Sequence, residues 1–197
     1  MTGIILAGGE NRRMGTDKAF LDVAGRPLVE RVINVLKGLF ERVIIVTNSP
    51  QSYARYAVSV VTDAIDKRGP LTGIYSGLLA SKDEYNFVAA CDMPFLNSGL
   101  IGHMAKEAEG YDVVVPEIRG NVEPLHAVYH KRLLPLIESQ IQRDSRQIRK
   151  IFESVKVRRI VEEEIARFDP DKRSFINLNT PQEYKEAVCL DLECRSC

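Results

Sequence analysis

Short apolar segments alternate with segments of helical periodicity along most of this chain, and this alternation restricts the possible folds more than any other feature. Continuous apolar residues, rather than alternating ones, are typical of parallel strands buried on both faces. Such strands are predicted over residues 3–7, 43–46, 58–61, 86–90 and 112–115, with further extended segments over 124–129 and 155–161. We therefore predict an α/β protein with three layers, in which helices cover both faces of an open, mostly parallel, Rossmann-like sheet.

Helices are predicted between the strands. Apolar residues recur with helical spacing after Pro27, a residue suited to the first turn of a helix. Further helices are predicted over residues 73–81 and 100–109, from Lys131 to about Phe152, and after Pro181. The chain has 197 residues, of which 45% are hydrophobic, and it shows no internal repeat or linker. We expect one domain over residues 1–186, followed by a cysteine-containing tail over residues 187–197.

The charge balance argues against partners that are attracted by a strong electrostatic field of the whole protein. Lysine and arginine number 27, aspartate and glutamate also number 27, and the formal net charge is zero. No field of the whole molecule therefore attracts nucleic acid or an anionic membrane, and a polyanion must be bound by a local cluster. No apolar run approaches the ~20 residues that span a bilayer. The first residues lack the basic region and the length of a secretory signal, so we expect a cytoplasmic protein.

The loop after the first predicted strand combines glycines with positive charge. Its glycines and cations are Gly8, Gly9, Arg12, Arg13, Gly15 and Lys18. Glycines let the backbone approach a ligand with N–H groups directed at anionic oxygens, and the cations supply charge. The signatures of P-loop enzymes and of dinucleotide-binding enzymes are both absent from this segment. The loop predicts a phosphate site of another kind; the alternative is a surface turn whose charges are solvated.

Aspartates follow two of the predicted strands. Asp63 comes after residues 58–61, and Asp92 comes after residues 86–90. Ligands of open α/β sheets bind at the carboxyl ends of the strands, so both carboxylates are expected near the glycine loop. A carboxylate in this place can hold Mg²⁺ against phosphate, which makes Asp92 the candidate metal ligand. Asp63 is a candidate for metal or ribose binding, and the alternative for both residues is an ordinary turn aspartate.

Four motifs in one order resemble those of the molybdenum cofactor guanylyltransferases. They lie at residues 6–18, 68–73, 91–95 and 175–181, and the likeness runs to Glu186. The double glycine after Ala7 resembles the guanylyl-transferring branch of these enzymes. The resemblance implies a sheet of the nucleotide-diphospho-sugar transferase type and a single nucleotidyltransferase domain. It also implies transfer of GMP from GTP to molybdopterin with release of pyrophosphate, and Mg²⁺ as cofactor.

The resemblance also implies which residues form the site. The catalytic residues would be Arg13, Lys18 and Asp92, with Lys18 on the nucleotide phosphates and Asp92 binding GTP together with Mg²⁺. The nucleotide-binding set would comprise Leu6, Ala7, Gly8, Gly9, Gly15, Lys18, Asp63, Gly69, Gly73, Asp92, Asn177 and Asn179. Direct displacement at the α-phosphorus needs aligned reactants and charge neutralisation, but no protein nucleophile.

Within that set, Asp63 with Gly69 and Gly73 would hold guanine and ribose. Asn177 and Asn179 resemble asparagines placed for the pterin or for the closed site. These asparagines also have a structural interpretation, because the same segment is typical of a turn before the last predicted helix. Product would pass to molybdoenzymes, with GTP and molybdopterin as the small-molecule partners.

Two other functions are consistent with the same residues. One is a related nucleotidyltransferase that uses CTP or a sugar 1-phosphate. The other is a non-catalytic guanine-nucleotide-binding module that acts on a partner enzyme. Pyrophosphate release distinguishes an enzyme from a binding module, and nucleotide competition distinguishes GTP from CTP.

His126 and the cysteines have alternative interpretations. His126 lies in a segment that resembles the pterin side of the family, but a single histidine in a strand is more often structural. Cys91 is interpreted as a small buried hydrophobic residue. The tail spacing of Cys189, Cys194 and Cys197 is seen in part of an iron–sulfur pattern and in zinc sites, yet a fourth ligand is missing downstream. Incidental thiols near a terminus are the favoured alternative.

Overall fold

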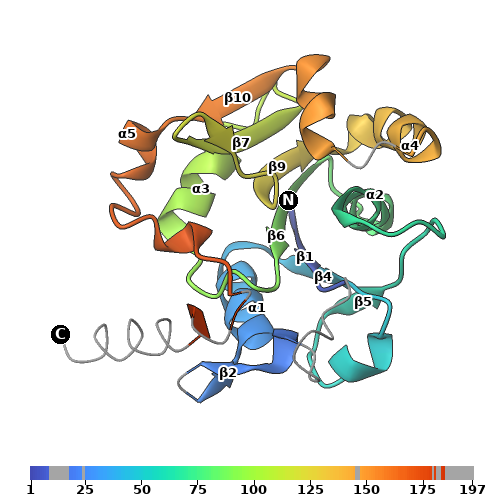
Figure 1. Cartoon of the computed structure of the whole chain (residues 1–197), viewed down its shortest axis with the longest axis vertical. Helices are drawn as coiled ribbons and strands as arrows, with labels where there is room; N and C mark the ends of the chain where they lie inside the picture. Colours follow the sequence, from blue (N-terminus) through green and yellow to red (C-terminus); the bar gives the residue numbers. More distant parts are fainter. Residues whose placement is uncertain (9–17, 24, 145–146, 179, 181–182, 185–197) are drawn as a thin grey trace.

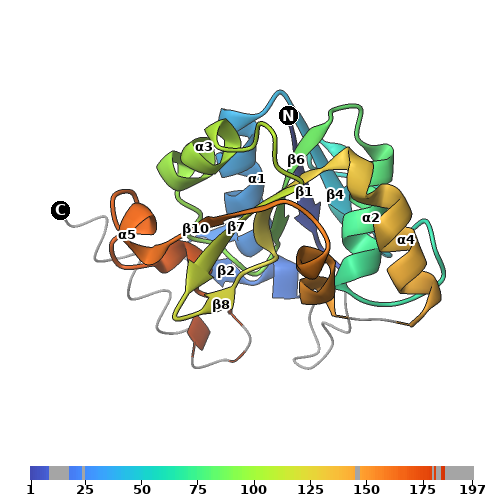
Figure 2. The same ribbon diagram turned by 90° about the horizontal axis from the view of Figure 1, so that it is seen from above.

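A mixed sheet with helices on both faces forms the centre of the molecule (Figures 1 and 2). This computed structural model describes residues 1–8, 18–23, 25–144, 147–178, 180 and 183–184. The strand order is β10-β7-β9-β6-β1-β4-β5, and β8 pairs with β7. These strands are β1 (Thr2–Leu6), β4 (Arg42–Val46), β5 (Ser59–Val61), β6 (Tyr85–Ala90), β7 (Val113–Ile118), β8 (Asn121–Val122), β9 (His126–His130) and β10 (Val157–Ile160). The predicted three-layer, mostly parallel architecture is confirmed.

The central strand β1 lies where the order of the strands reverses. It pairs in parallel with β4 on one side and with β6 on the other, so that Leu6 lies opposite both Val46 and Ala90. The pairs β4–β5 and β7–β10 are also parallel. In contrast, β9 runs antiparallel to both of its neighbours, β6 and β7. Its amino end therefore lies beside the carboxyl end of β6, an arrangement that the apolar pattern did not indicate.

Helices cover the two faces of the sheet in pairs. On one face lie α1 (Leu28–Leu39) and α3 (Ser98–Lys106), and on the other lie α2 (Pro70–Ala80) and α4 (Leu134–Gln142) (Figure 2). Ile5 of β1 packs in the cluster that contains α1 and α3, whereas its neighbour Ile4 packs in the cluster that contains α2 and α4. Both isoleucines are fully buried, which explains why the strand is apolar at consecutive positions. In the described part of the chain, no helix has the length and apolarity needed to cross a bilayer.

Two helix predictions differ from the structure. The continuous helix predicted from Lys131 to Phe152 is wrong, because α4 ends at Gln142 and a separate 3-10 helix spans Ile148–Glu153. Asp144 between them has a φ of +56°, a left-handed conformation that ends an α-helix. The helix predicted over residues 73–81 starts earlier, at Pro70 of α2.

The shortest elements, such as a hairpin that depends on hydrogen bonds within its turn, were not predicted. The hairpin of β2 (Asp22–Val23) and β3 (Arg26–Pro27) turns at Gly25, whose φ is +86° and whose N–H donates to Asp22 Oδ1 at 2.6 Å. A four-residue helix, α5 (Glu162–Ile165), was also not predicted. The helix predicted after Pro181 and the tail over residues 187–197, with Cys189, Cys194 and Cys197, lie largely or wholly outside the described residues.

Candidate active site

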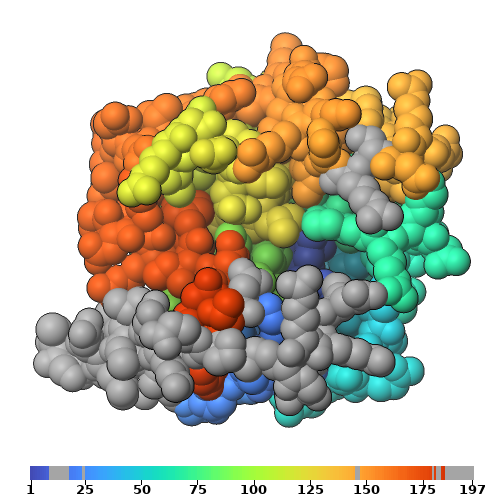
Figure 3. All heavy atoms as spheres, viewed as in Figure 1, coloured from blue at the N-terminus to red at the C-terminus, as the bar shows by residue number. Residues whose placement is uncertain are grey.

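The carboxyl ends of β1 and β6 form the base of the candidate site. The N–H of Cys91 donates to the carbonyl of Leu6 at 3.1 Å, and the N–H of Ala7 donates to the carbonyl of Val46 at 2.9 Å. Two chain segments thus leave adjacent parallel strands at one point, which is the place where open α/β sheets bind ligands. Figure 3 shows the dark-blue atoms of the first strand at the bottom of a hollow between the green atoms of the α2 region and the yellow atoms of the β9 region.

Lys18 and Asp92 come together at this edge. Lys18 opens a short 3-10 helix (Lys18–Phe20) and is only 7% exposed. Burial raises the pKa of the Asp92 carboxyl and the charge of Glu183 adds to the rise, while a backbone hydrogen bond and the charge of Lys18 oppose it. The opposing effect of Lys18 on the pKa places its ammonium within electrostatic range of the carboxylate. Lys18 and Asp92 therefore lie near enough for their charges to interact.

Other predicted residues lie outside the described part of the chain. They are Gly9, Arg12, Arg13, Gly15 and Asn179. Leu6, Ala7 and Gly8 are described, and Gly8 is exposed directly after the buried Ala7. A Cβ built on Gly8 meets no described atom within 4 Å.

Asp63 lies at the same edge, after β5, and its partner is a residue that the sequence reasoning missed. The side-chain N–H of Asn48 donates to Asp63 Oδ2 at 2.8 Å. Asn48 follows β4 just as Asp63 follows β5, and the N–H of Thr47 donates to the carbonyl of Val61 at 2.9 Å. Its position at a strand end is the available signal, but an asparagine in this place is also typical of an ordinary turn.

The start of α2 packs closely on β1. Gly69 has a φ of +143°, which favours glycine, and its carbonyl accepts the N–H groups of Thr72 at 3.1 Å and Gly73 at 3.3 Å. Gly73 is buried within α2, where an added Cβ would lie 3.2 Å from Leu6 Cδ2. The absence of a side chain at Gly73 thus lets the helix approach the end of β1.

A segment from the end of the described chain reaches the Asp92 turn. The N–H of Leu178 donates to the carbonyl of Asp92 at 3.1 Å, and Asn177 beside it is half-buried. His126 packs against Phe87 and Phe175 with ring centroids 5.1 Å and 5.0 Å away. Burial lowers the pKa of His126 to about 3, so the ring is neutral at physiological pH. These contacts support the structural interpretation of His126.

Glu123, between β8 and β9, is a second acidic residue close to Asp92. Burial raises the pKa of the Glu123 carboxyl, and the charge of Asp92 raises it further, whereas the N–H of Leu125 and the charge of Arg149 lower it. Leu125 joins Glu123 to the end of β6, because its N–H donates to Glu123 Oε1 at 3.2 Å and its carbonyl accepts the N–H of Ala90 at 3.1 Å. The apolar pattern did not predict that Glu123 lies near Asp92, because this proximity depends on the reversed direction of β9.

The donor set around Asp92 fits Mg²⁺ bound together with a substrate. Mg²⁺ is usually held by one or two carboxylates and by substrate phosphates, rather than by a cage of protein ligands. Among the residues that the structure describes, no group of three or more histidine, cysteine, aspartate or glutamate side chains is placed to hold a metal. A single carboxylate such as Asp92 is the type of ligand that Mg²⁺ takes when substrate phosphates complete its coordination.

The family follows from a match over most of the chain. A model of the MobA-like NTP transferase domain matches residues 3–166. The chain belongs to the MobA-like NTP transferase family. Among relatives of this MobA-like chain, a molybdenum cofactor guanylyltransferase from Desulfosudis oleivorans is 41% identical over 189 residues, which are 95% of this chain and 94% of the relative. A probable molybdenum cofactor guanylyltransferase from Natranaerobius thermophilus is 37% identical, with 95% of this chain and 94% of the relative covered.

Solved structures agree with this assignment. The molybdopterin-guanine dinucleotide biosynthesis protein A of Archaeoglobus fulgidus superposes on the MobA-like chain with a TM-score of 0.87 and 28% identity, covering 98% of this chain and 100% of that one. A 4-diphosphocytidyl-2C-methyl-D-erythritol synthase from Anaerococcus prevotii, with a TM-score of 0.74, 15% identity and coverage of 97% and 95%, shares the fold. The predicted fold type, family and nucleotidyltransferase class are thereby confirmed.

Proposed function

We propose that this protein transfers GMP from GTP to molybdopterin in the cytoplasm, releasing pyrophosphate and forming the guanine dinucleotide form of the cofactor. The observation that carries the proposal is the convergence of Lys18 and Asp92 at the carboxyl ends of β1 and β6. The names of the relatives at 37% and 41% identity supply the substrates. Molybdoenzymes are the proposed recipients of the product.

The site supports a direct displacement. A phosphate oxygen of molybdopterin attacks the α-phosphorus of GTP, a new P–O bond forms, and the bond to the pyrophosphate oxygen breaks. Lys18 neutralises charge on the phosphates, and its burial removes competing water, which strengthens this interaction. The exposed backbone at Gly8 approaches the nucleotide. Arg13 is proposed to add a second positive charge.

Asp92 is the residue that would hold Mg²⁺ in this reaction. When bound, Mg²⁺ supplies charge neutralisation on the phosphate oxygens. The half-buried Asp92 carboxylate, which lies within electrostatic range of Lys18, follows the turn at the end of β6, and its backbone carbonyl accepts the N–H of Leu178. Glu123 adds negative charge on the opposite backbone segment, which strengthens the attraction of this edge for a cation.

The remaining described residues are proposed to bind the nucleoside. Asn48 and Asp63 are hydrogen-bonded to each other and offer polar groups to ribose or guanine, while Gly69 and Gly73 keep the start of α2 close to Leu6. Gly9 and Gly15 are proposed to complete the phosphate loop. Asn177 and Asn179 are proposed to contact the pterin side.

Pyrophosphate release from each of the four ribonucleoside triphosphates, with and without molybdopterin, tests this function. We expect release only with GTP, Mg²⁺ and molybdopterin together, and loss of release in Lys18→Ala and Asp92→Ala. Lys150 is an exposed lysine, so the variant Lys150→Ala serves as the matched control and should retain full activity. Release with CTP instead would indicate a related transferase, and tight GTP binding without release would indicate a binding module; either result contradicts the proposal.

A further inference from the structure

Lys67 connects the nucleotide-binding edge to a helix on the outside of the molecule. Its ammonium donates to the carbonyl of Ile141 at 2.9 Å, to the carbonyl of Gln142 at 3.4 Å and to Asp144 Oδ1 at 2.9 Å. Ile141 and Gln142 are the last residues of α4, and the carbonyl of Ile141 also accepts the backbone N–H of Asp144 at 3.1 Å. A lysine at this end adds a charged donor to the last carbonyls and interacts favourably with the helix dipole.

The segment that carries Lys67 is irregular. Residues 62–69 link β5 to α2 and contain no helix or strand. Asp63 lies at the start of this segment and Gly69 lies at its end, so both proposed nucleotide contacts depend on its conformation. The N–H of Ala64, which donates to Ser76 Oγ at 2.9 Å, fixes the part next to Asp63. Lys67 fixes the part next to Gly69.

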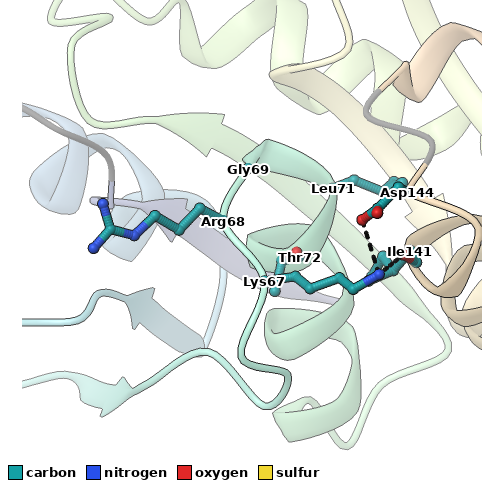
Figure 4. Close-up of a pocket in the computed structure, with 7 residues that line it drawn as sticks. All are labelled: Lys67, Arg68, Gly69, Leu71, Thr72, Ile141 and Asp144. Carbon is teal, nitrogen blue, oxygen red and sulfur yellow. Dashed lines mark hydrogen bonds and ion pairs between the residues drawn. The ribbon is translucent and has the colours of Figure 1, made fainter.

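The side chains of Lys67 and Arg68 extend in opposite directions (Figure 4). Arg68 points away from α4, whereas Lys67 reaches Ile141 and Asp144 across a cavity of about 230 Å³ at the start of α2. Leu71 and Thr72 of α2 line the same cavity. The ammonium of Lys67 thus joins the irregular segment to the end of α4 on the far side of this space.

We propose that Lys67 is a positioning residue, which holds residues 64–69 in their binding conformation before the nucleotide arrives. This inference rests on the proposed function, because it assigns the nucleotide to the edge formed by Asp63 and Gly69. A segment that is fixed in advance loses little conformational entropy when the ligand binds, so its anchor increases affinity without touching the ligand. The anchor acts on binding and leaves the chemical step at Lys18 and Asp92 unchanged.

The test compares GTP binding and turnover in Lys67→Met, Lys67→Arg and Asp144→Asn. Lys67→Met keeps the length of the side chain but removes the ammonium, and we expect the Kd for GTP to rise about 10-fold, with kcat at saturating GTP within about twofold of the wild type. Lys67→Arg keeps donors for the two carbonyls and should stay within about threefold of the wild-type Kd. Asp144→Asn is the matched control, because the bonds to the carbonyls remain, and asparagine tolerates the φ of +56°. Faster hydrogen exchange of residues 64–69 in Lys67→Met gives a readout that does not depend on activity.

Two results would overturn the positioning role. One is an unchanged Kd for GTP in Lys67→Met, whether or not kcat falls. The other is an equal rise of the Kd in Asp144→Asn, which would assign the effect to the ion pair rather than to the end of α4. Failure of the proposed function is distinguishable from both, because the wild-type protein would then not bind GTP or not release pyrophosphate.

Discussion

Replacement of Gly77 by alanine tests whether the position of α2 on the sheet is fixed by close packing. A Cβ at Gly77 would lie 2.5 Å from Ile4 Cγ2, 3.1 Å from Ile4 Cδ1 and 3.3 Å from Val46 Cγ2. The distance of 2.5 Å is far below an ordinary carbon–carbon contact. Ile4 is fully buried and branched at Cβ, so its Cγ2 methyl cannot turn away, and either the helix or the strand must move.

The expected change in the free energy of unfolding of Gly77→Ala has two contributions of opposite sign. Overpacking a core by one methyl group costs about 1–3 kcal/mol. Alanine stabilises a helix interior by about 0.5–1 kcal/mol relative to glycine, which offsets part of this cost. Gly102→Ala in α3 is the matched control, because a Cβ there meets nothing within 4 Å and only the favourable part applies. The free energies of unfolding of the two variants should therefore differ by about 1–3 kcal/mol.

Urea unfolding of the wild type and both variants measures this difference. We expect Gly102→Ala to be more stable than the wild type and Gly77→Ala to be the less stable of the two variants, with similar slopes against urea concentration. Equal free energies of unfolding would refute the reasoning, because α2 would then adjust to a methyl group at no cost. A shift of α2 would also move Gly69 and Gly73 relative to Leu6, so the same variant is expected to raise the KM for GTP.

Three further predictions concern charged residues. Lys18→Met should lower kcat/KM for GTP by about 100–1,000-fold in steady-state kinetics, because an oriented cation on the phosphates is lost. Asp92→Asn should abolish turnover yet increase stability at pH 7, because burial raises the pKa of Asp92 and its ionised form opposes folding. The urea midpoints of that variant and the wild type should coincide at low pH and diverge as the pH rises through the raised pKa. For Glu164, a side-chain hydrogen bond from Arg158 lowers the pKa to about 2. Glu164→Gln should therefore be less stable than the wild type at pH 6, and the difference should vanish as the pH falls toward 2.

The sequence predicted the parts of the fold that depend on burial. Strands β1, β4 and β6 are apolar at consecutive positions because helices cover both faces, and such runs have few alternatives. The positions of Lys18 and Asp92 followed from the same strands, since the carboxyl ends of neighbouring parallel strands meet at one edge.

The parts that were missed depend on single residues or on tertiary contacts. The helix predicted from Lys131 to Phe152 is interrupted where Asp144 adopts a left-handed conformation, and apolar spacing continues on both sides of this break. The turn at Arg119 and Gly120, with φ values of +49° and +72°, joins β7 to the two-residue strand β8. Neither feature changes the hydrophobic pattern on which the prediction depended. Asn48 was missed for a different reason: an asparagine at a strand end is so common in turns that its type alone carries little information.

The reversed strand explains why Glu123 belongs to the candidate site although it follows no parallel strand. In an open parallel sheet only residues after a strand reach the ligand edge. Because β9 is antiparallel to β6, His126 lies opposite Ala89, and the residues before β9 reach the edge instead. The bond from Ala90 to Leu125 then places Glu123 near Asp92, which lies two residues beyond Ala90. A single change of strand direction thus brings a carboxylate from the amino end of a strand to an edge that is otherwise formed by carboxyl ends.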